Sequence, residues 1–125
     1  MKRDMDYIRS ILLDVETERM DGRFESLINL EDEESGKELD KLRYHSRLVA
    51  GSGFVTCIRD VSFGDVPTDL TWRGCDFLDT IRDDDVWRKT KSGASKAAGA
   101  GFGFIVELAK GYAKAELKKL GLPLG

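Results

Sequence analysis

The sequence predicts an α+β domain followed by an amphipathic helix. Two observations carry this prediction. Apolar residues recur at three- and four-residue steps in segments 4–17 and 35–50, and a segment rich in β-branched and aromatic residues folds back on itself over 54–70. The chain has 125 residues, of which 41% are hydrophobic and 34% charged. These values suit one soluble domain that buries a core without metal or disulfide staples.

The first helix is expected over residues 4–17. Its apolar positions lie at helical spacing: Met5, Ile8, Ile11, Leu12 and Val15. Asp4 and Asp6 lie where the N-terminus of a helix favours negative charge. Asp21-Gly22 is predicted to break this helix, and the short apolar run 24–30 is interpreted as a strand.

The second helix is expected over 35–50, because Ser35 and Glu38 have the spacing of a capping box. Its core stripe is Leu39, Leu42, Ser46 and Val49. The acidic run 31–34 before it is interpreted as a solvated loop. A calcium site is the less favoured alternative, since the spaced oxygen ligands of a calcium loop are missing.

A β-hairpin is predicted from strands at 54–61 and 66–70, joined by a turn at 62–65, with Pro67 indicating an edge strand. Thr71 is expected to cap the helix that follows. The buried face of that helix is predicted to be Gly74, Phe77, Leu78 and Ile81. The three aspartates at 83–85 are interpreted as the cap of a turn over 87–91 rather than as a metal site.

The C-terminal part changes character. Residues 1–91 are expected to form the domain, and the Gly-, Ala- and Ser-rich residues 92–103 a loose connection. An amphipathic helix is predicted over 104–121. The apolar stripe leading into and along it is Phe102, Ile105, Val106, Ala109, Tyr112, Ala113, Leu117 and Leu120.

Charge and cysteine usage narrow the class of protein. The net charge is −3, so any binding of nucleic acid must come from a local basic patch. No secretory signal or membrane-spanning run is evident, and a cytoplasmic location is expected. Cys57 and Cys75 form no C-x-x-C pair and are interpreted as two small buried thiols rather than a disulfide or zinc site.

The residues that could carry chemistry have no partners at suitable spacing. His45 is the single histidine, and it is interpreted as a packed, hydrogen-bonded core residue rather than a metal ligand or general base. The "GAGFG" stretch at 99–103 lacks the last glycine and the preceding strand of a phosphate-binding loop. Trp72 and Trp87 are interpreted as packing anchors rather than base-stacking residues. We therefore expect no enzyme, no cofactor and no metal.

Three ordered blocks carry a family resemblance: "MKRDMDYIRSILL", "YHSRLVAGSGFV" and "LTWRGCDFLDTIRDDDVW". With the closing "LKKLGL", they resemble the bacterial and phage domain-of-unknown-function family numbered twenty-five thirteen over roughly residues 1–91. Ser46 and Gly51 depart from its common pattern, so the second helix is expected to pack more loosely. The resemblance implies a small winged-helix-like protein, often encoded by a phage or prophage. It brings no established activity and no catalytic residues.

The expected arrangement is winged-helix-like: helix, short strand, helix, β-hairpin wing and helix, with the added C-terminal amphipathic helix. It makes helix 35–50 the candidate for contact with DNA. In helix-turn-helix proteins, one helix enters the major groove and the wing reaches the adjacent backbone. The residues we expect to contact double-stranded DNA are Lys37, Lys41, Tyr44, Arg47 and Arg59. The alternative is that they are ordinary solvent-facing charges, which the nearby Asp40 favours.

A second hypothesis concerns the C-terminal helix. Its apolar face must dock within the chain, pair with a second copy in an oligomer or engage a foreign protein. The residues expected to make this contact are Ile105, Val106, Ala109, Tyr112 and Leu117. A membrane-surface role is less favoured, because Glu107 and Glu116 interrupt the basic face and the helix has no Trp.

Overall fold

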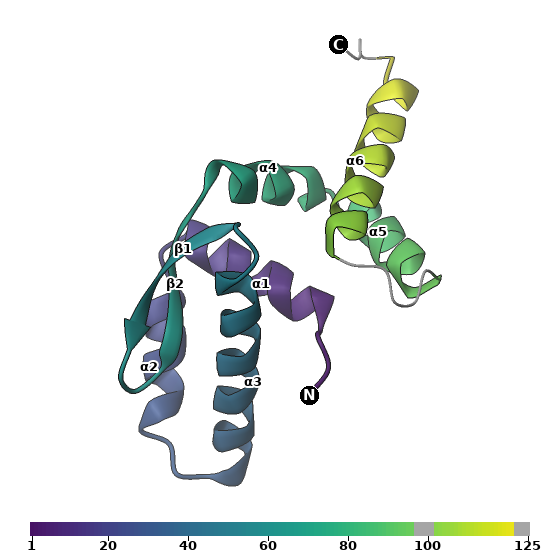
Figure 1. The fold of residues 1–125 in the computed structure, drawn as a ribbon. Helices are drawn as coiled ribbons and strands as arrows, with labels where there is room; N and C mark the ends of the chain where they lie inside the picture. Colours follow the sequence, from purple (N-terminus) through teal and green to yellow (C-terminus); the bar gives the residue numbers. More distant parts are fainter. Residues whose placement is uncertain (97–101, 122–125) are drawn as a thin grey trace. The chain divides into compact units, whose positions relative to one another are not determined.

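A computed structural model describes residues 1–96 and 102–121. Within those residues the chain forms six helices and one two-stranded antiparallel hairpin, so the predicted α+β class is confirmed (Figure 1). The chain divides into two compact units, Met1–Cys75 and Asp76–Gly125.

The first unit has the element order of a winged helix. Helices α1 (Met5–Glu16), α2 (Met20–Ile28) and α3 (Glu33–Ala50) are followed by the hairpin of β1 (Val55–Asp60) and β2 (Gly64–Leu70). Strand β2 packs against both α1 and α3, and α2 packs against α3 (Figure 1). Each element contributes apolar side chains to one core, and the largest fully buried ones are Phe24, Phe54, Ile11, Leu12, Leu42 and Val49.

The strand predicted at 24–30 is wrong, because residues 24–28 form the second half of helix α2. Met20 and Phe24 are both buried and lie four residues apart, which is the spacing of neighbours on one helix face. Asp21-Gly22 does not act as a break: Asp21 lies in the first turn, where a negative charge is favourable. Arg23 ties α2 to α1, since its Nη1 donates to the Asp14 carboxylate at 3.0 Å.

Helix α3 begins earlier than predicted. Its N-cap is Asp32, whose Oδ1 accepts the backbone N–H of Ser35 at 2.8 Å. The capping box that begins at Ser35 is therefore wrong. The solvated loop predicted at 31–34 is wrong for Glu33 and Glu34, which form the first turn of the helix, although all four acidic residues are exposed. The predicted core stripe is confirmed at its three later positions, which are buried, while Leu39 is half-buried.

The hairpin is confirmed. Its two strands pair in register from Val55 opposite Leu70 to Asp60 opposite Gly64, with one irregularity between Thr56 and Cys57. The tight turn depends on Gly64, whose φ of 82° is a left-handed conformation that favours glycine. The Asp60 carboxylate also holds the turn, because its Oδ1 accepts the N–H groups of both Ser62 and Phe63.

Helix α4 (Trp72–Ile81) starts where the hairpin ends. Thr71 caps it as predicted, since its hydroxyl oxygen accepts the Gly74 N–H at 3.1 Å. The four positions predicted to be buried on this helix are buried. Gly74 is required by close approach, because a Cβ atom there would lie 1.9 Å from the carbonyl oxygen of Phe54.

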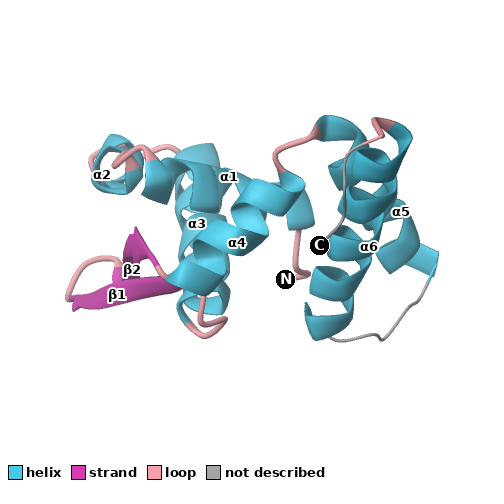
Figure 2. Ribbon diagram, turned by 90° about the horizontal axis from the view of Figure 1, so that it is seen from above, coloured by secondary structure: helices cyan, strands magenta, loops and turns pink. Residues whose placement is uncertain are grey.

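In the second unit, α5 (Asp84–Lys96) and α6 (Phe102–Lys119) lie side by side (Figure 2). The Asp83 cap is confirmed, since its Oδ1 accepts the Val86 N–H at 2.9 Å. Helix α5 runs on to Lys96, so the predicted loose connection is wrong for residues 92–96. It is also wrong for Phe102 and Gly103, which begin α6, while residues 97–101, with the first three positions of "GAGFG", lie outside the described residues.

Three predictions of buried side chains are wrong. Cys57 and Cys75 are both exposed, and the Trp72 side chain is 86% exposed. Cys57 lies in the middle of β1, where the four consecutive residues from Thr56 to Arg59 are all exposed to solvent. Trp72 lies two residues before Gly74 and so on the opposite side of α4 from its buried face. Trp87 is buried, as predicted.

Candidate nucleic-acid interface

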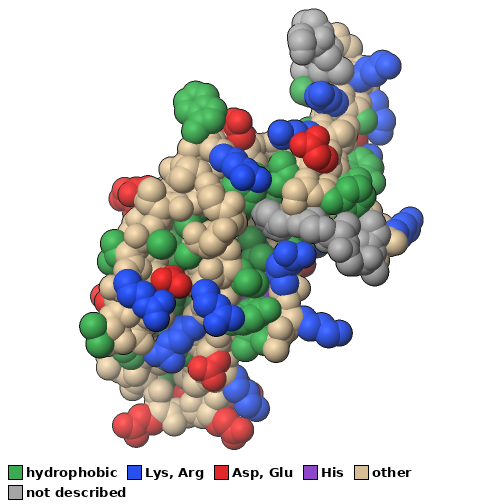
Figure 3. Space-filling view, viewed as in Figure 1, with side chains coloured by type: hydrophobic (Ala, Val, Ile, Leu, Met, Phe, Trp, Pro, Cys, Tyr) green, Lys and Arg blue, Asp and Glu red, His purple; other side chains and the backbone are tan. Residues whose placement is uncertain are grey.

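Side chains of α3 and of the hairpin line one open hollow of about 360 Å³ in the first unit. The lining residues are Asp40, Arg43, Tyr44, Arg47, Arg59, Phe63, Gly64 and Asp65. Figure 3 shows basic side chains gathered over the region where α3, β1 and β2 lie in Figure 1, with an acidic side chain among them. The hollow is therefore a place where cationic groups from α3 and from the hairpin meet.

Three of the five predicted DNA-binding residues come together here: Tyr44, Arg47 and Arg59. The Arg47 guanidinium lies over the Tyr44 ring, 5.6 Å from its centroid, which holds the arginine by a cation–π contact. Arg59 pairs with Asp65, its cross-strand neighbour, at 3.2 Å. The fold thus gathers residues that are up to fifteen positions apart in the chain.

The other two predicted residues lie elsewhere. Lys41 is half-buried, with its Nζ 3.5 Å from an Asp4 oxygen and 4.6 Å from the centroid of the Tyr7 ring. Lys37 is exposed and pairs with Glu33 one turn earlier. Neither lysine lines the hollow. Of the predicted contact residues on α3, only Tyr44 and Arg47 lie in it.

Sequence reasoning missed Arg43, Phe63 and Asp65. Arg43 fixes the hairpin loop to α3, because its Nη2 donates to the carbonyl oxygen of Ser62 at 2.6 Å. The Phe63 ring packs on Phe24 with centroids 4.8 Å apart, which anchors the same loop to α2. Asp65 was missed because the turn was predicted over 62–65, whereas the turn lies at 61–63 and places Asp65 directly opposite Arg59.

The charges of the hollow nearly balance. Its lining holds three arginines and two aspartates, a net charge of +1. Asp65 pairs with Arg59, and Asp40 lies 3.9 Å from Arg43. Among the described residues, Arg47 has no carboxylate at ion-pair distance, so its guanidinium is available to an incoming anion. The acidic first turn of α3 repels anions at the other end of the same helix.

His45 lies inside the unit and does not reach the hollow. It is fully buried, its Nε2 accepts the Asp4 N–H at 2.9 Å, and its Nδ1 lies 2.8 Å from the carbonyl oxygen of Lys41. The interpretation of His45 as a packed, hydrogen-bonded residue is confirmed. Beside it, burial and a 2.7 Å hydrogen bond to Glu38 raise the pKa of Tyr7 to about 12.

The residues of the predicted interaction helix fall into two groups. Ile105, Val106 and Ala109 are buried within the second unit, and Tyr112 is half-buried beside Gly93 of α5. Leu117 is exposed. The side chain of Phe102 lies outside the described residues. Helix α5 therefore covers the first half of the apolar stripe of α6.

Comparisons with known proteins agree with the resemblance seen in the sequence. A family model described as "Hypothetical protein (DUF2513)" matches residues 2–101. The chain belongs to the DUF2513 family. An "Uncharacterized protein" of Haemophilus influenzae (strain Rd) is 35% identical over 95 residues, which are 74% of this chain and 77% of that protein. No solved structure matches the chain.

The DUF2513 match contains the winged-helix unit and every residue that lines the hollow, and it ends immediately before α6. Among the described residues, no cluster of three or more His, Cys, Asp and Glu side chains is placed to hold a metal ion. None of the described helices combines the length and apolar character needed to cross a membrane.

Proposed function

We propose that the winged-helix unit binds double-stranded DNA through the α3–hairpin hollow and acts as a transcriptional regulator. The family resemblance adds the expectation that it is encoded by a phage or prophage. One observation carries the proposal: three guanidinium groups and a phenol from two different elements converge on one open hollow. Arginine and tyrosine side chains of this kind are common donors to DNA phosphates.

The balance of charge indicates which part of DNA is contacted. Arg47 is free of carboxylates, so it is the first candidate to meet a phosphate. Arg59 can exchange its exposed contact with Asp65 for a phosphate oxygen at little cost, since exposed ion pairs contribute little to stability. The acidic first turn of α3 disfavours deep entry of that end into a groove. We therefore expect contacts to the backbone to dominate over contacts to base edges.

The test is a fluorescence-anisotropy titration of a labelled duplex over a salt series of roughly 50 to 200 mM. Affinity should fall steeply with salt. Arg47→Ala and Arg59→Ala should each weaken binding and lower the slope of log K against log salt by about one. Lys41→Ala should change the slope less, because Lys41 lies beside Asp4 and Tyr7.

The matched control is Arg88→Ala. Arg88 is as exposed as Arg59, 73% against 77%, and likewise pairs with one aspartate, but it lies on α5 in the other unit. Binding by the control should equal that of the wild type. The proposal is wrong if the wild type binds no duplex at the lowest salt, or if Arg88→Ala lowers the slope as much as Arg47→Ala does.

A further inference from the structure

The second unit contains an open groove of about 500 Å³ between α4, α5 and α6. Its lining residues are Asp76, Asp79, Thr80, Asp83, Val86, Lys110, Ala113, Glu116, Leu117 and Leu120. The groove is distinct from the hollow of the first unit and shares no residue with it. It combines an apolar wall with a rim of carboxylates.

The apolar wall is the end of α6. Ala113, Leu117 and Leu120 follow one another at four- and three-residue steps, so they share one face of the helix. Leu117 is 40% exposed and Leu120 74%, whereas Ile105 and Ala109 on the earlier turns are buried. The last turns of α6 therefore carry an apolar face that nothing in this unit covers.

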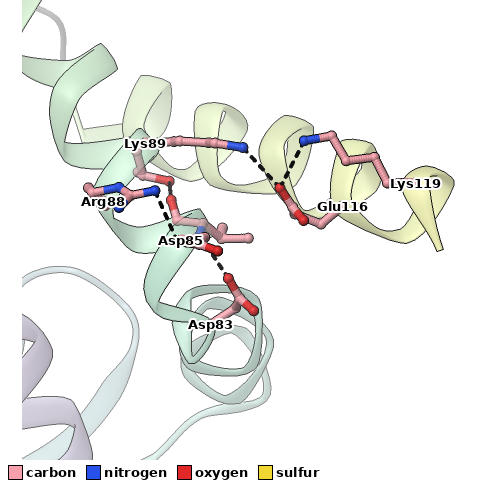
Figure 4. Close-up of polar contacts among 8 residues, drawn as sticks. Asp83, Asp85, Arg88, Lys89, Glu116 and Lys119 are labelled. Carbon is pink, nitrogen blue, oxygen red and sulfur yellow. Dashed lines mark hydrogen bonds and ion pairs between the residues drawn. The ribbon is translucent and has the colours of Figure 1, made fainter.

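The carboxylates of the rim are not equally engaged. Glu116 accepts from Lys89 of α5 at 2.9 Å and lies 3.4 Å from Lys119 (Figure 4). These two ammonium groups lower the pKa of Glu116, and Glu116 in turn raises the pKa of Lys89. Asp79 pairs with Arg82 at 2.9 Å. Among the described residues, the Asp76 carboxylate has no oppositely charged partner.

Complementary charges lie on the tip of α6, which we define as residues 114–120. Lys114 and Lys118 are exposed, lie four residues apart on one side of the helix, and flank Leu117. Neither has a carboxylate at ion-pair distance in the described part of the chain. Leu117 and Leu120 therefore belong both to the tip and to the wall of the groove. This shared apolar face has the unpaired Lys114 and Lys118 beside it on the tip and the unpaired Asp76 on the rim of the groove.

We infer that the groove seats the tip of α6 from a second copy of this chain, so that two copies form a two-fold symmetric dimer. In such an arrangement the same patch serves on both sides. Leu117 and Leu120 of each copy cover one another, and Lys114 and Lys118 of each copy meet Asp76 of the other. The contact is small, so the dimer is expected to be weak and to dissociate on dilution.

The test is sedimentation velocity of the full chain over a concentration series from low micromolar to near millimolar. The wild type should shift from monomer to dimer with rising concentration. Leu117→Glu and Leu120→Glu should each raise the dimer Kd about 30-fold or more, as expected for residues at the centre of an interface. Leu30→Glu is the matched control, because Leu30 is also half exposed but lies in the first unit.

A charge swap separates this contact from non-specific association. Asp76→Lys should weaken the dimer, and adding Lys114→Glu and Lys118→Glu to the same chain should restore it. Circular dichroism should show that every variant keeps its helix content. A wild type that stays monomeric overturns the inference, even if the groove then binds a basic amphipathic peptide. So does a dimer that folded Leu117→Glu leaves unchanged, or one that the charge swap fails to restore.

Discussion

The backbone N–H of Asp4 donates to Nε2 of His45 across 2.9 Å, which joins the start of α1 to the middle of α3. Because Nε2 accepts this bond, the ring proton lies on Nδ1, from which it donates to the carbonyl oxygen of Lys41 at 2.8 Å. The single histidine of the chain thus connects two helices of the winged-helix unit with both of its ring nitrogens.

Replacing this histidine should destabilise the first unit. His45→Leu fills the same space in the core with an apolar side chain, but it leaves the Asp4 N–H without its acceptor. We therefore expect a loss of about 2 kcal/mol in the free energy of unfolding. Urea denaturation measures the loss. Lys37→Ala on the exposed side of the same helix should stay within about 0.5 kcal/mol of the wild type. Equal stability of His45→Leu and the wild type would contradict the role given to this contact.

Tyr7 should lose its proton unusually late. Its pKa is raised from 10.0 to about 12, first by burial and then by the hydrogen bond to Glu38. Because the folded pKa is the higher one, this group stabilises the fold below pH 10.0, and the contribution is lost as the pH rises towards about 12. Ultraviolet titration should show a late step that Tyr7→Phe removes and Glu38→Gln moves to lower pH. A late step that survives in Tyr7→Phe belongs to another residue.

Two glycine-to-alanine changes should act in opposite directions. Gly74→Ala places a Cβ atom 1.9 Å from the Phe54 carbonyl oxygen, and the backbone must shift, so we expect a loss of about 3 kcal/mol. Gly36→Ala in α3 meets no atom within 4 Å and should stabilise by about 1 kcal/mol, because alanine favours a helix. Thermal denaturation of both variants compares them directly. A stable Gly74→Ala would show that α4 and the hairpin do not approach as described.

Both cysteines should react in the native protein. Cys57 on β1 and Cys75 on α4 are exposed. A thiol reagent added without denaturant should therefore label two thiols per chain, and Cys57→Ser and Cys75→Ser should each lower this number to one. Labelling that requires denaturant would support the sequence-based expectation that both thiols are buried.

Much of the fold could be predicted because its signals are local. Thr71, Asp83 and the paired strands of the hairpin follow from capping and turn chemistry that a few neighbouring residues determine. The short helix α2 was missed because its nine residues bury only Met20 and Phe24, too few for a clear period. The start of α3 was misplaced because Asp32 and Ser35 can each cap a helix, and the aspartate does so.

The candidate site was predicted only in part, because tertiary packing decides which residues line the hollow. Helical spacing placed Lys37, Lys41, Tyr44 and Arg47 on the outer side of α3. It could not show that α1 approaches Lys41, while the hairpin loop reaches Arg43 and completes the hollow. Spacing likewise predicted the apolar stripe of α6, but not that α5 covers only its first half.

The contrast between Trp72 and Trp87 gives the protein its own optical reporters. One indole faces water in the unit Met1–Cys75, and the other is enclosed in the unit Asp76–Gly125. Iodide should quench the emission of the first and spare the second in the folded protein, and unfolding of the unit Asp76–Gly125 should open Trp87 to the quencher. With Trp72→Phe and Trp87→Phe, each signal can be recorded alone and without an attached dye.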